Sequence, residues 1–162
     1  MSFISSSSDL STDRLVLRPW TMAEVGAVLA GERRDHWADD FPAEGDRVIA
    51  GFIAETPTAL GEYGQRQIIE SASGLVVGAI GLFWPPVDGA VEFGYGVVES
   101  RRGRGYANEA ARALVAFALV APGVEAVTAT VELSNPASVR VLEKAGLRRL
   151  HGDARTATFG TA

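Results

Sequence analysis

Residues 92–112 read EFGYGVVESRRGRGYANEAAR and combine three structural signals in one short segment. The first part alternates as a strand does, with Phe93, Tyr95 and Val97 on one side and charged or small residues on the other. A run of arginine and glycine follows, and an apolar helical pattern begins near Gly105. The segment therefore predicts a strand, a glycine-rich turn and the start of a helix.

This combination is suited to holding a phosphate. Glycines let the backbone approach an anion closely, and the first N–H groups of a helix point at it with the macrodipole behind them. Arg101, Arg102 and Arg104 add cationic side chains that fit phosphate oxygens. The spacing is not a dinucleotide fingerprint, because Asn108 stands where the third glycine is needed, and the Walker A pattern is absent. These two absences make a nucleotide-phosphate binder the weakest of the functions considered for this segment.

Composition excludes several functional classes. The 162 residues are 47% hydrophobic, which is enough for a real core, and none is cysteine. Disulfides, thiolate zinc sites and a cysteine nucleophile are therefore ruled out. His36 and His151 have no partner at metal-ligand spacing, so no metal site is predicted. The net charge of −5 argues against a general binder of nucleic acid.

The chain is expected to form one folded unit. Residues 1–11 are serine-rich without periodicity and predict a flexible N-terminal tail, and residues 12–162 predict a single domain. No basic region precedes an apolar one at the start of the chain. The longest apolar run, Ala113 to Ala121, is too short to cross a bilayer. We therefore expect a cytoplasmic protein with no membrane partner.

Hydrophobic periodicity and turn residues predict a mixed α/β (α+β) architecture. The predicted strands cover residues 14–18, 65–71, 75–83, 90–98, 125–133, 147–151 and 155–159. The predicted helices cover residues 21–30, 46–55, 105–120 and 135–145. A right-handed crossover places the strand at 125–133 parallel to the strand at 90–98. The order is βααβββαβαββ, with about seven strands in one central sheet and about four helices.

Residues 102–107, RGRGYA, match the pattern R/Q-x-x-G-x-G/A, which is the pyrophosphate signature of the GNAT superfamily of acetyl-CoA-dependent N-acetyltransferases. The element order also resembles the GNAT fold. Segments Thr12–Trp20, Glu92–Tyr95 and Asn135–Leu147 are similar to the branch that contains the RimJ and RimL ribosomal-protein N-terminal acetyltransferases. The resemblance covers about residues 12–159, and the chain is identified as a member of this superfamily.

The resemblance implies acetyl-CoA as the acyl-donor cosubstrate. Its pyrophosphate would contact the signature itself: Arg102, Gly103, Arg104, Gly105, Tyr106 and Ala107. Val97 lies where the central strand of the family pairs with pantetheine and polarises the thioester carbonyl. Asn135 is predicted as a helix cap and, by resemblance, as a contact to the pantetheine arm. The alternative for the arginine run, a flexible RNA-binding segment, is disfavoured because the run is internal and the chain is acidic.

Amide formation from a thioester requires an unprotonated amine, a stabilised oxyanion and a protonated thiolate. Because aliphatic amines have pKa values near ~10, a base must be within reach. Glu92 stands where family members carry a strand carboxylate and is the expected base; the alternative is a solvated surface carboxylate. Many relatives place a tyrosine seven residues after the asparagine, where this chain has Leu142. The expected acid is therefore Ser138. The alternative is that its hydroxyl forms a hydrogen bond to the backbone, as a serine in the first turn of a helix more often does.

These expectations describe direct acetyl transfer from acetyl-CoA to a primary amine in a ternary complex, without a metal or a covalent intermediate. The acceptor is either a protein N-terminal α-amine or a small-molecule amine, and the acidic segment Glu32–Asp46 favours a cationic one. A non-catalytic acyl-CoA-binding sensor or partner module of the same fold is the alternative. This alternative remains because Leu142 stands where many relatives carry a tyrosine, and because the segment after His151 is short. Family members frequently dimerise, so a homodimer is a further expectation of the resemblance.

Overall fold

The computed structural model describes residues 8–162, and its elements follow the predicted order with one strand added at the start. The strands are β1 (Leu10–Ser11), β2 (Leu15–Pro19), β3 (Gln65–Glu70), β4 (Val76–Val87), β5 (Ala90–Val97), β6 (Ala126–Glu132), β7 (Arg148–Gly152) and β8 (Thr156–Gly160). The helices are α1 (Met22–Leu29), α2 (Glu44–Glu55), α3 (Tyr106–Leu119) and α4 (Pro136–Lys144). Short 3₁₀ turns lie at Pro57–Ala59 and Glu99–Arg101.

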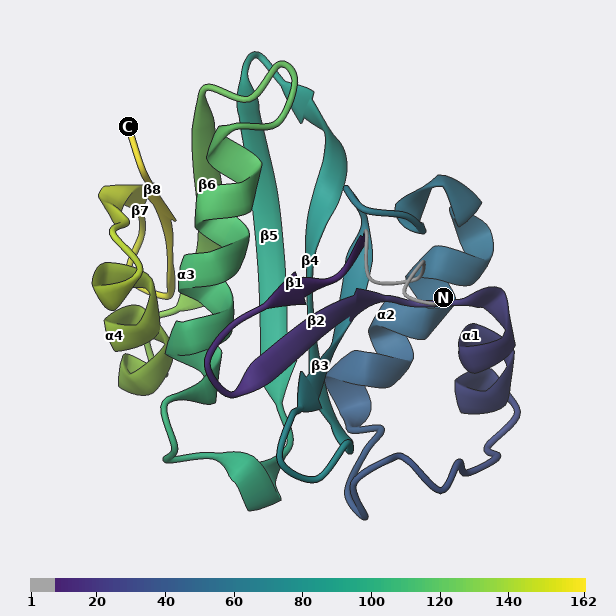
Figure 1. Ribbon diagram of the computed structural model, residues 1–162. Helices are drawn as coiled ribbons and strands as arrows, with labels where there is room; N and C mark the ends of the chain where they lie inside the picture. Colours follow the sequence, from purple (N-terminus) through teal and green to yellow (C-terminus); the bar gives the residue numbers. More distant parts are fainter. Residues whose placement is uncertain (1–7) are drawn as a thin grey trace.

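The strands form one mixed sheet in the spatial order β1-β2-β3-β4-β5-β6-β8-β7 (Figure 1). The predicted α/β class and the parallel pairing of β5 with β6 are confirmed, and β3, β4 and β5 form an antiparallel meander. Among residues 8–162 the sheet has eight strands rather than about seven, and the α-helices number the predicted four. Within residues 8–162, no helix is long and apolar enough to cross a bilayer.

The additional strand, β1, lies in the stretch for which the sequence predicts a flexible tail. Residues 1–7 of that stretch lie outside the described residues. Leu10 pairs with Leu17 of β2, and Asp9 accepts a hydrogen bond from Arg18, with 3.0 Å between Oδ2 and Nη2. Residues 10 and 11 therefore belong to the sheet, because backbone pairing and an ion pair hold them against β2.

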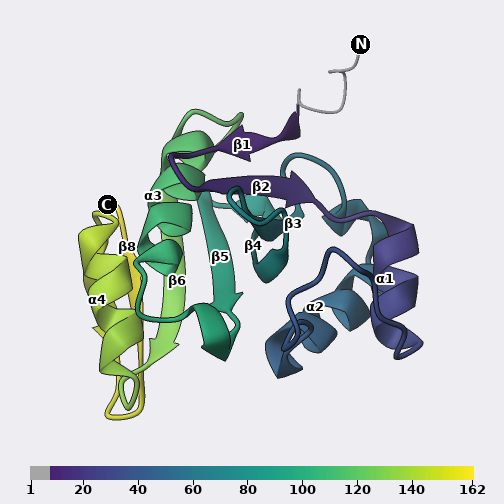
Figure 2. The same ribbon diagram turned by 60° about the horizontal axis from the view of Figure 1, so that its bottom comes forward.

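Helices cover both faces of the sheet, as neighbouring residues of β4 show. Phe83 packs against Phe52 of α2, with 5.5 Å between ring centroids. Trp84 stacks on Tyr63, which in turn stacks on Phe117 of α3. Because successive residues of a strand point to opposite faces, α2 and α3 lie on opposite sides of the sheet (Figure 2).

Two predicted helix starts are confirmed by their caps. The Thr21 side chain accepts from the N–H of Glu24, whose carboxylate accepts from the N–H of Thr21, completing a capping box at α1. Asn135 Oδ1 accepts from the N–H of Ser138 at 3.2 Å and caps α4.

β4 runs further than predicted, through two prolines that the sequence assigns to a turn. Its ladder with β5 is interrupted between Phe83 and Val87, so Pro85 and Pro86 occupy positions where no backbone N–H is needed. The chain then reverses at Asp88 and Gly89, which have φ angles of 52° and 82°. This two-residue turn is typical of a hairpin.

The pairing of β5 with β6 ends early. The two strands pair at Ala90 with Ala126, at Val91 with Val127, and last at Glu92 with Thr128. β5 nevertheless continues to Val97 and β6 to Glu132, and the two ribbons separate beyond the last pair (Figure 2). We call this opening, formed by residues 93–97 and 129–132, the fork.

One acidic side chain of the N-terminal half is buried at the start of α2. Asp46 is 5% exposed, and its Oδ2 accepts from the N–H of Ala43 at 2.8 Å. Burial raises the pKa of Asp46 to about 6, against the lowering effects of that hydrogen bond and of Arg47. Since the folded pKa lies above the ordinary value, the contribution of Asp46 to stability is full at low pH and decreases as the pH rises through about 6.

The Asp46→Asn variant should therefore be more stable than the wild type at pH 8. Asparagine keeps the oxygen that accepts from Ala43 and removes the buried charge, so the gain should be at most about 3 kcal/mol. Urea unfolding at a series of pH values should show the gain shrinking as the pH falls through 6 toward 4. Asp39→Asn, which changes an exposed carboxylate, is the control. A gain that is independent of pH, or a loss at pH 8, would contradict this account of Asp46.

Candidate functional site

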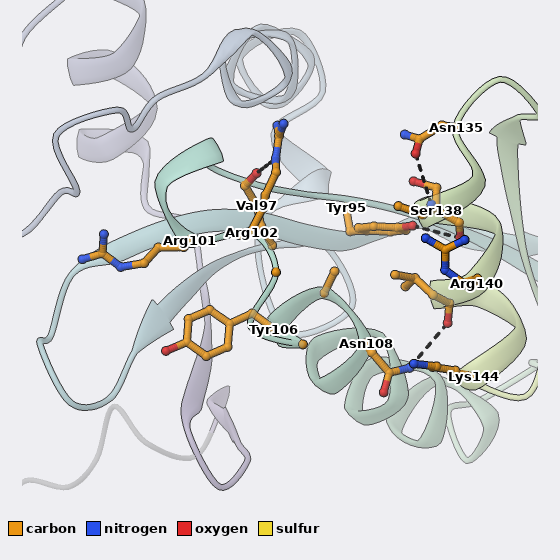
Figure 3. A pocket seen from close by; sticks show the side chains of 15 residues that line it. Tyr95, Val97, Arg101, Arg102, Tyr106, Asn108, Asn135, Ser138, Arg140 and Lys144 are labelled. Carbon is orange, nitrogen blue, oxygen red and sulfur yellow. Dashed lines mark hydrogen bonds between the residues drawn. The ribbon is translucent and has the colours of Figure 1, made fainter.

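A cavity of about 470 Å³ lies between the end of β5, the arginine–glycine loop and helices α3 and α4 (Figure 3). Most of the predicted site residues line it: Val97, Arg102, Gly103, Gly105, Tyr106, Ala107, Asn135 and Ser138. The structure thus brings together side chains from β5, α3 and α4. Arg104 and Glu92 do not line this cavity.

The loop before α3 has the backbone conformation that the sequence suggests. Gly103 and Gly105 have φ angles of 80° and 83°, in the left-handed region that favours glycine. Gly105 is the N-cap of α3 and provides no side-chain cap. The first N–H groups of this 14-residue helix are therefore left for solvent or for a ligand at the cavity, which is the geometry of an anion site. We call this site, formed by residues 103–107, the anion cradle.

The three arginines of the loop differ in their contacts. Arg102 borders the cavity, and its Nε donates to the carbonyl oxygen of Val97 at 2.9 Å. Arg101 and Arg104 both reach Glu70 at the end of β3, with 3.1 Å from Arg101 Nε and 3.5 Å from Arg104 Nη1 to Oε2. Arg104 is thus held by a carboxylate outside the cavity, whereas the sequence places it on the pyrophosphate.

Glu70 organises this side of the site, and sequence reasoning missed it. Besides the two arginines it accepts from the hydroxyls of Ser73 at 2.6 Å and Tyr106 at 2.7 Å. The Ser73 hydrogen bond lowers the pKa of Glu70; burial opposes this, and Tyr106 and Arg101 lower it further. Tyr106 is the first residue of α3, so Glu70 ties the loop and the helix start to β3.

Two further cations of the cavity were also missed. Arg140 and Lys144 project from α4 and border it together with Asn108 of α3 (Figure 3). They are four residues apart on one helix, so they lie on the same face. A repeat of two basic residues at helical spacing is too common to identify a site from the sequence alone. Together with Arg102, they make the cavity cationic.

The fork holds a second cavity, of about 240 Å³, between β5 and β6. Tyr95, Asn135 and Ser138 border both cavities, so the two are adjacent parts of one cleft. The N–H of Val98 donates to Val77 of β4 at 2.8 Å. Since alternate residues of an antiparallel strand direct their backbone groups to opposite sides, those of Tyr95 and Val97 point away from β4 into the fork.

Glu92 lies at the apex of the fork. It is the last residue of β5 that pairs with β6, and its side chain is exposed. It pairs across the ladder with Phe83, which packs on α2, so its side chain lies on the α2 face of the sheet. The carboxylate and the Tyr95 side chain are therefore on opposite faces of the same strand.

Two carboxylates of the acidic segment Glu32–Asp46 make contacts within the fold and do not face solvent freely. Asp40 accepts from the N–H and the hydroxyl of Ser100, at 2.9 and 2.8 Å, which fastens this segment to the turn before the loop. Asp46 is buried at the start of α2. The expectation of a cationic acceptor therefore rests on the exposed members alone: Glu32, Asp35, Asp39 and Glu44. Within residues 8–162, no three His, Asp or Glu side chains gather as a metal site would require.

A family described as the acetyltransferase (GNAT) domain matches residues 14–148. No curated protein matches the chain significantly. Among solved structures, a GNAT-family acetyltransferase from Bordetella pertussis is 29% identical, with a TM-score of 0.67 over 95% of this chain and 99% of that chain.

Two more distant structures share the fold. The GNAT-family acetyltransferase from Bacillus anthracis is 20% identical, with a TM-score of 0.68 over 94% of this chain and 96% of that chain. RimL, the ribosomal L7/L12 alpha-N-protein acetyltransferase in complex with coenzyme A, is 14% identical, with a TM-score of 0.69 over 94% of this chain and 96% of that chain. At these identities the likeness concerns the fold.

Replacing Glu70 by glutamine should lower the free energy of unfolding by about 1.5–3 kcal/mol at pH 7, because Arg101, Arg104 and Tyr106 lose hydrogen bonds to a charged carboxylate. The folded pKa of Glu70 lies below its ordinary value, so its stabilising effect is present above that value and is lost as the pH falls through the folded pKa. Unfolding by urea at pH 7 and pH 3 measures this. Glu109→Gln, which breaks the ion pair with Arg14 outside the cavity, is the control for a more exposed pair. Equal losses for Glu70→Gln at both pH values would contradict the assignment.

Gly105→Ala should weaken the binding of coenzyme A by up to about tenfold. An L-residue with a left-handed φ is strained by roughly 1–2 kcal/mol, and the loop can relieve this strain by turning the first N–H groups of α3 away from the cavity. Calorimetric titration with coenzyme A gives the affinity. Gly31→Ala is the matched control, since Gly31 has a φ of 74° and lies away from the cavity. The two variants should lose similar stability, and only Gly105→Ala should lose affinity; unchanged affinity would contradict the proposed cradle.

Proposed function

The chain belongs to the GNAT acetyltransferase family, and we propose that it transfers an acetyl group from acetyl-CoA to a primary amine. The transfer is direct, within a ternary complex of donor, acceptor and enzyme. The observation that carries this proposal is the continuity of the cleft: the anion cradle and the fork share Tyr95, Asn135 and Ser138 as a common border. A molecule with a diphosphate at one end and a thioester at the other can therefore occupy both.

In this proposal the diphosphate contacts the loop and the start of α3. The N–H groups of residues 103–107 and the guanidinium of Arg102 supply the donors. Arg104 acts indirectly, because its contact with Glu70 fixes the loop. The pantetheine arm follows the open edge of β5, where backbone groups of Tyr95 and Val97 face the fork, and the Asn135 amide contacts it from α4.

Glu92 is the proposed base. It removes a proton from the amine as nitrogen attacks the thioester carbonyl, directly or through one water molecule. The negative charge that develops on the carbonyl oxygen is stabilised by a fixed backbone N–H of β5 in the fork. The position of Glu92 at the apex, with its side chain exposed on the α2 face, supports this role.

The acceptor is a protein N-terminal α-amine or a small-molecule amine. The RimJ/RimL-like assignment is supported by the segments Thr12–Trp20 and Asn135–Leu147, and the distant RimL structure adds only the fold. A panel of N-terminal peptides, polyamines and aminoglycosides, assayed by release of coenzyme A thiol, tests the proposed function.

A non-catalytic acyl-CoA-binding module is the second candidate. It is favoured by Leu142, which is fully buried at the position where many relatives carry a tyrosine. The position of Glu92 outside both cavities also favours it. Tight binding of coenzyme A without thiol release from any amine of the panel would support this candidate over the enzyme.

The Glu92→Gln variant should lower kcat by about 10²–10⁴-fold, the usual contribution of a positioned base. Its dissociation constant for coenzyme A should stay within about twofold, because Glu92 lies on the other face of the sheet from the cradle. Thiol release across a pH series and calorimetry measure the two quantities. Glu125→Gln, an exposed carboxylate before β6, is the control. If kcat of Glu92→Gln equals that of the wild type across the series, Glu92 is not the base.

A further inference from the structure

The leaving thiolate needs a proton, and two hydroxyl groups of the described residues belong to side chains that border both cavities of the cleft, whereas Thr130 and Tyr106 border only one cavity each. The two hydroxyls are those of Ser138, at the start of α4, and of Tyr95, on β5. Leu142, which stands at the position of the tyrosine that many relatives carry, is 0% exposed and has no proton to donate.

Tyr95 extends from β5 across the cleft toward α4 (Figure 3). Its ring lies 6.2 Å from that of Phe93 on the same face of the strand, which limits its orientation. Its hydroxyl donates to the main-chain oxygen of Ser138 at 3.5 Å, which is long for an O–H···O bond. The hydroxyl is thus held near α4 but weakly, so it can turn to an incoming acceptor atom.

We propose that Tyr95 is the catalytic acid that protonates the sulfur of coenzyme A, and that Ser138 is not. This proposal rests on the proposed function and names the proton donor that the reaction lacks. Tyr95 borders both cavities, one beside the diphosphate cradle and one inside the fork. Its hydroxyl therefore lies in the part of the cleft that a thioester spans.

The amine nitrogen forms a bond to the thioester carbonyl carbon, and Glu92 takes one proton from the nitrogen. The C–S bond breaks, its electron pair goes to sulfur, and the phenolic proton of Tyr95 moves to that sulfur. The products are the amide and the free thiol. The phenolate then regains a proton from solvent, and Glu92 loses one to solvent, which restores the enzyme.

The acid strength of Tyr95 suits this transfer. Burial raises the pKa of Tyr95, against the effect of the Ser138 hydrogen bond, so the hydroxyl keeps its proton at neutral pH. Of the two hydroxyls, only the phenol belongs to a group that titrates among protein side chains, with an ordinary pKa near ~10. Tyrosine is accordingly among the side chains that act as general acids.

The charged groups around the cleft favour the phenolate that forms. They come from the loop, from α4 and from β6: Arg101, Arg102, Arg140, Lys144 and Glu132. Four of these are cations and one is an anion, so the field stabilises negative charge on Tyr95 during the transfer. The diphosphate of the donor would offset part of this field.

Ser138 has a different role in the structure. Its N–H donates to Asn135 Oδ1 at 3.2 Å, and its carbonyl oxygen accepts from Tyr95. Within the described residues, its hydroxyl makes no hydrogen bond to protein. Its backbone therefore closes the helix cap and orients Tyr95, and removing the hydroxyl leaves both of these contacts in place.

The test compares three single substitutions in the full chain: Tyr95→Phe, Ser138→Ala and Tyr63→Phe. Tyr63 lies outside the cleft, stacked on Trp84, and serves as the control for loss of a tyrosine hydroxyl. Thiol release with a primary amine that the wild type accepts gives kcat and KM, and calorimetry gives the affinity for coenzyme A. Tyr95→Phe should lower kcat by about 10²–10⁴-fold with affinity for coenzyme A within about twofold. Tyr63→Phe should stay within about threefold of the wild type, and Ser138→Ala should lower kcat much less than Tyr95→Phe does.

A second measurement separates acid catalysis from packing. Site-specific replacement of Tyr95 by 3,5-difluorotyrosine keeps the ring and lowers the phenol pKa. The alkaline limb of the kcat–pH profile, where the phenol must stay protonated, should then move to lower pH. Packing alone would leave the limb in place, and an unmoved limb would overturn the proposal.

The outcomes for the proposal and for the proposed function can be told apart. Normal turnover by Tyr95→Phe, or a large loss in Ser138→Ala alone, would overturn the role of Tyr95 and leave the acetyltransferase intact. A wild-type protein that binds coenzyme A but releases no thiol with any amine would overturn the proposed function and the acid role together.

Discussion

The early end of the β5–β6 pairing is the constraint on which the site depends. Backbone N–H and C=O groups in a buried setting need partners, and in the fork β6 no longer provides them for β5. The opening does not collapse, because each strand keeps its other neighbour. β5 stays paired with β4 up to Val97, and β6 stays paired with β8 as far as Glu132. The sheet therefore presents an edge of β5 whose backbone groups, apart from the Val97 carbonyl that Arg102 holds, are left for a ligand or water to satisfy.

The loop that follows β5 connects this edge to the start of α3. Glu70 fixes the loop and the first residue of α3 relative to the sheet. Glu70 belongs to β3, two strands away from the fork, yet it accepts from Arg101, Arg104 and Tyr106. The carboxylate offsets the repulsion between neighbouring arginines and holds Arg101 and Arg104 by ion pairs. Arg101 and Arg102 both border the cavity, and Arg102 Nε holds the Val97 carbonyl. The cradle is thus pre-organised by contacts that a ligand does not have to form.

The sequence predicted what local patterns determine and missed what distant contacts determine. Alternation in β5, the capping box at Thr21 and the cap at Asn135 are encoded within a few residues, and each is present in the structure. The role of Glu70 depends on partners 31 to 36 residues away, which no periodicity reveals. β1 is two residues long and exists only because β2 is beside it. Within the site, the motif predicted which residues gather, and the tertiary contacts decided which of the arginines face the cavity.

Strand alternation also separates the two chemical tasks of the proposed reaction. Glu92 and Tyr95 are three residues apart on β5, an odd separation, so their side chains lie on opposite faces of the sheet. Proton removal from the amine then takes place on the α2 face, and proton delivery to sulfur takes place on the face of α3 and α4. The acceptor and the donor thus need not compete for one cavity, and they meet only where the fork opens the sheet between them. This arrangement suits direct transfer, in which both substrates are bound at once. It also explains why Tyr95 borders the two cavities of the cleft while Glu92 borders neither of them.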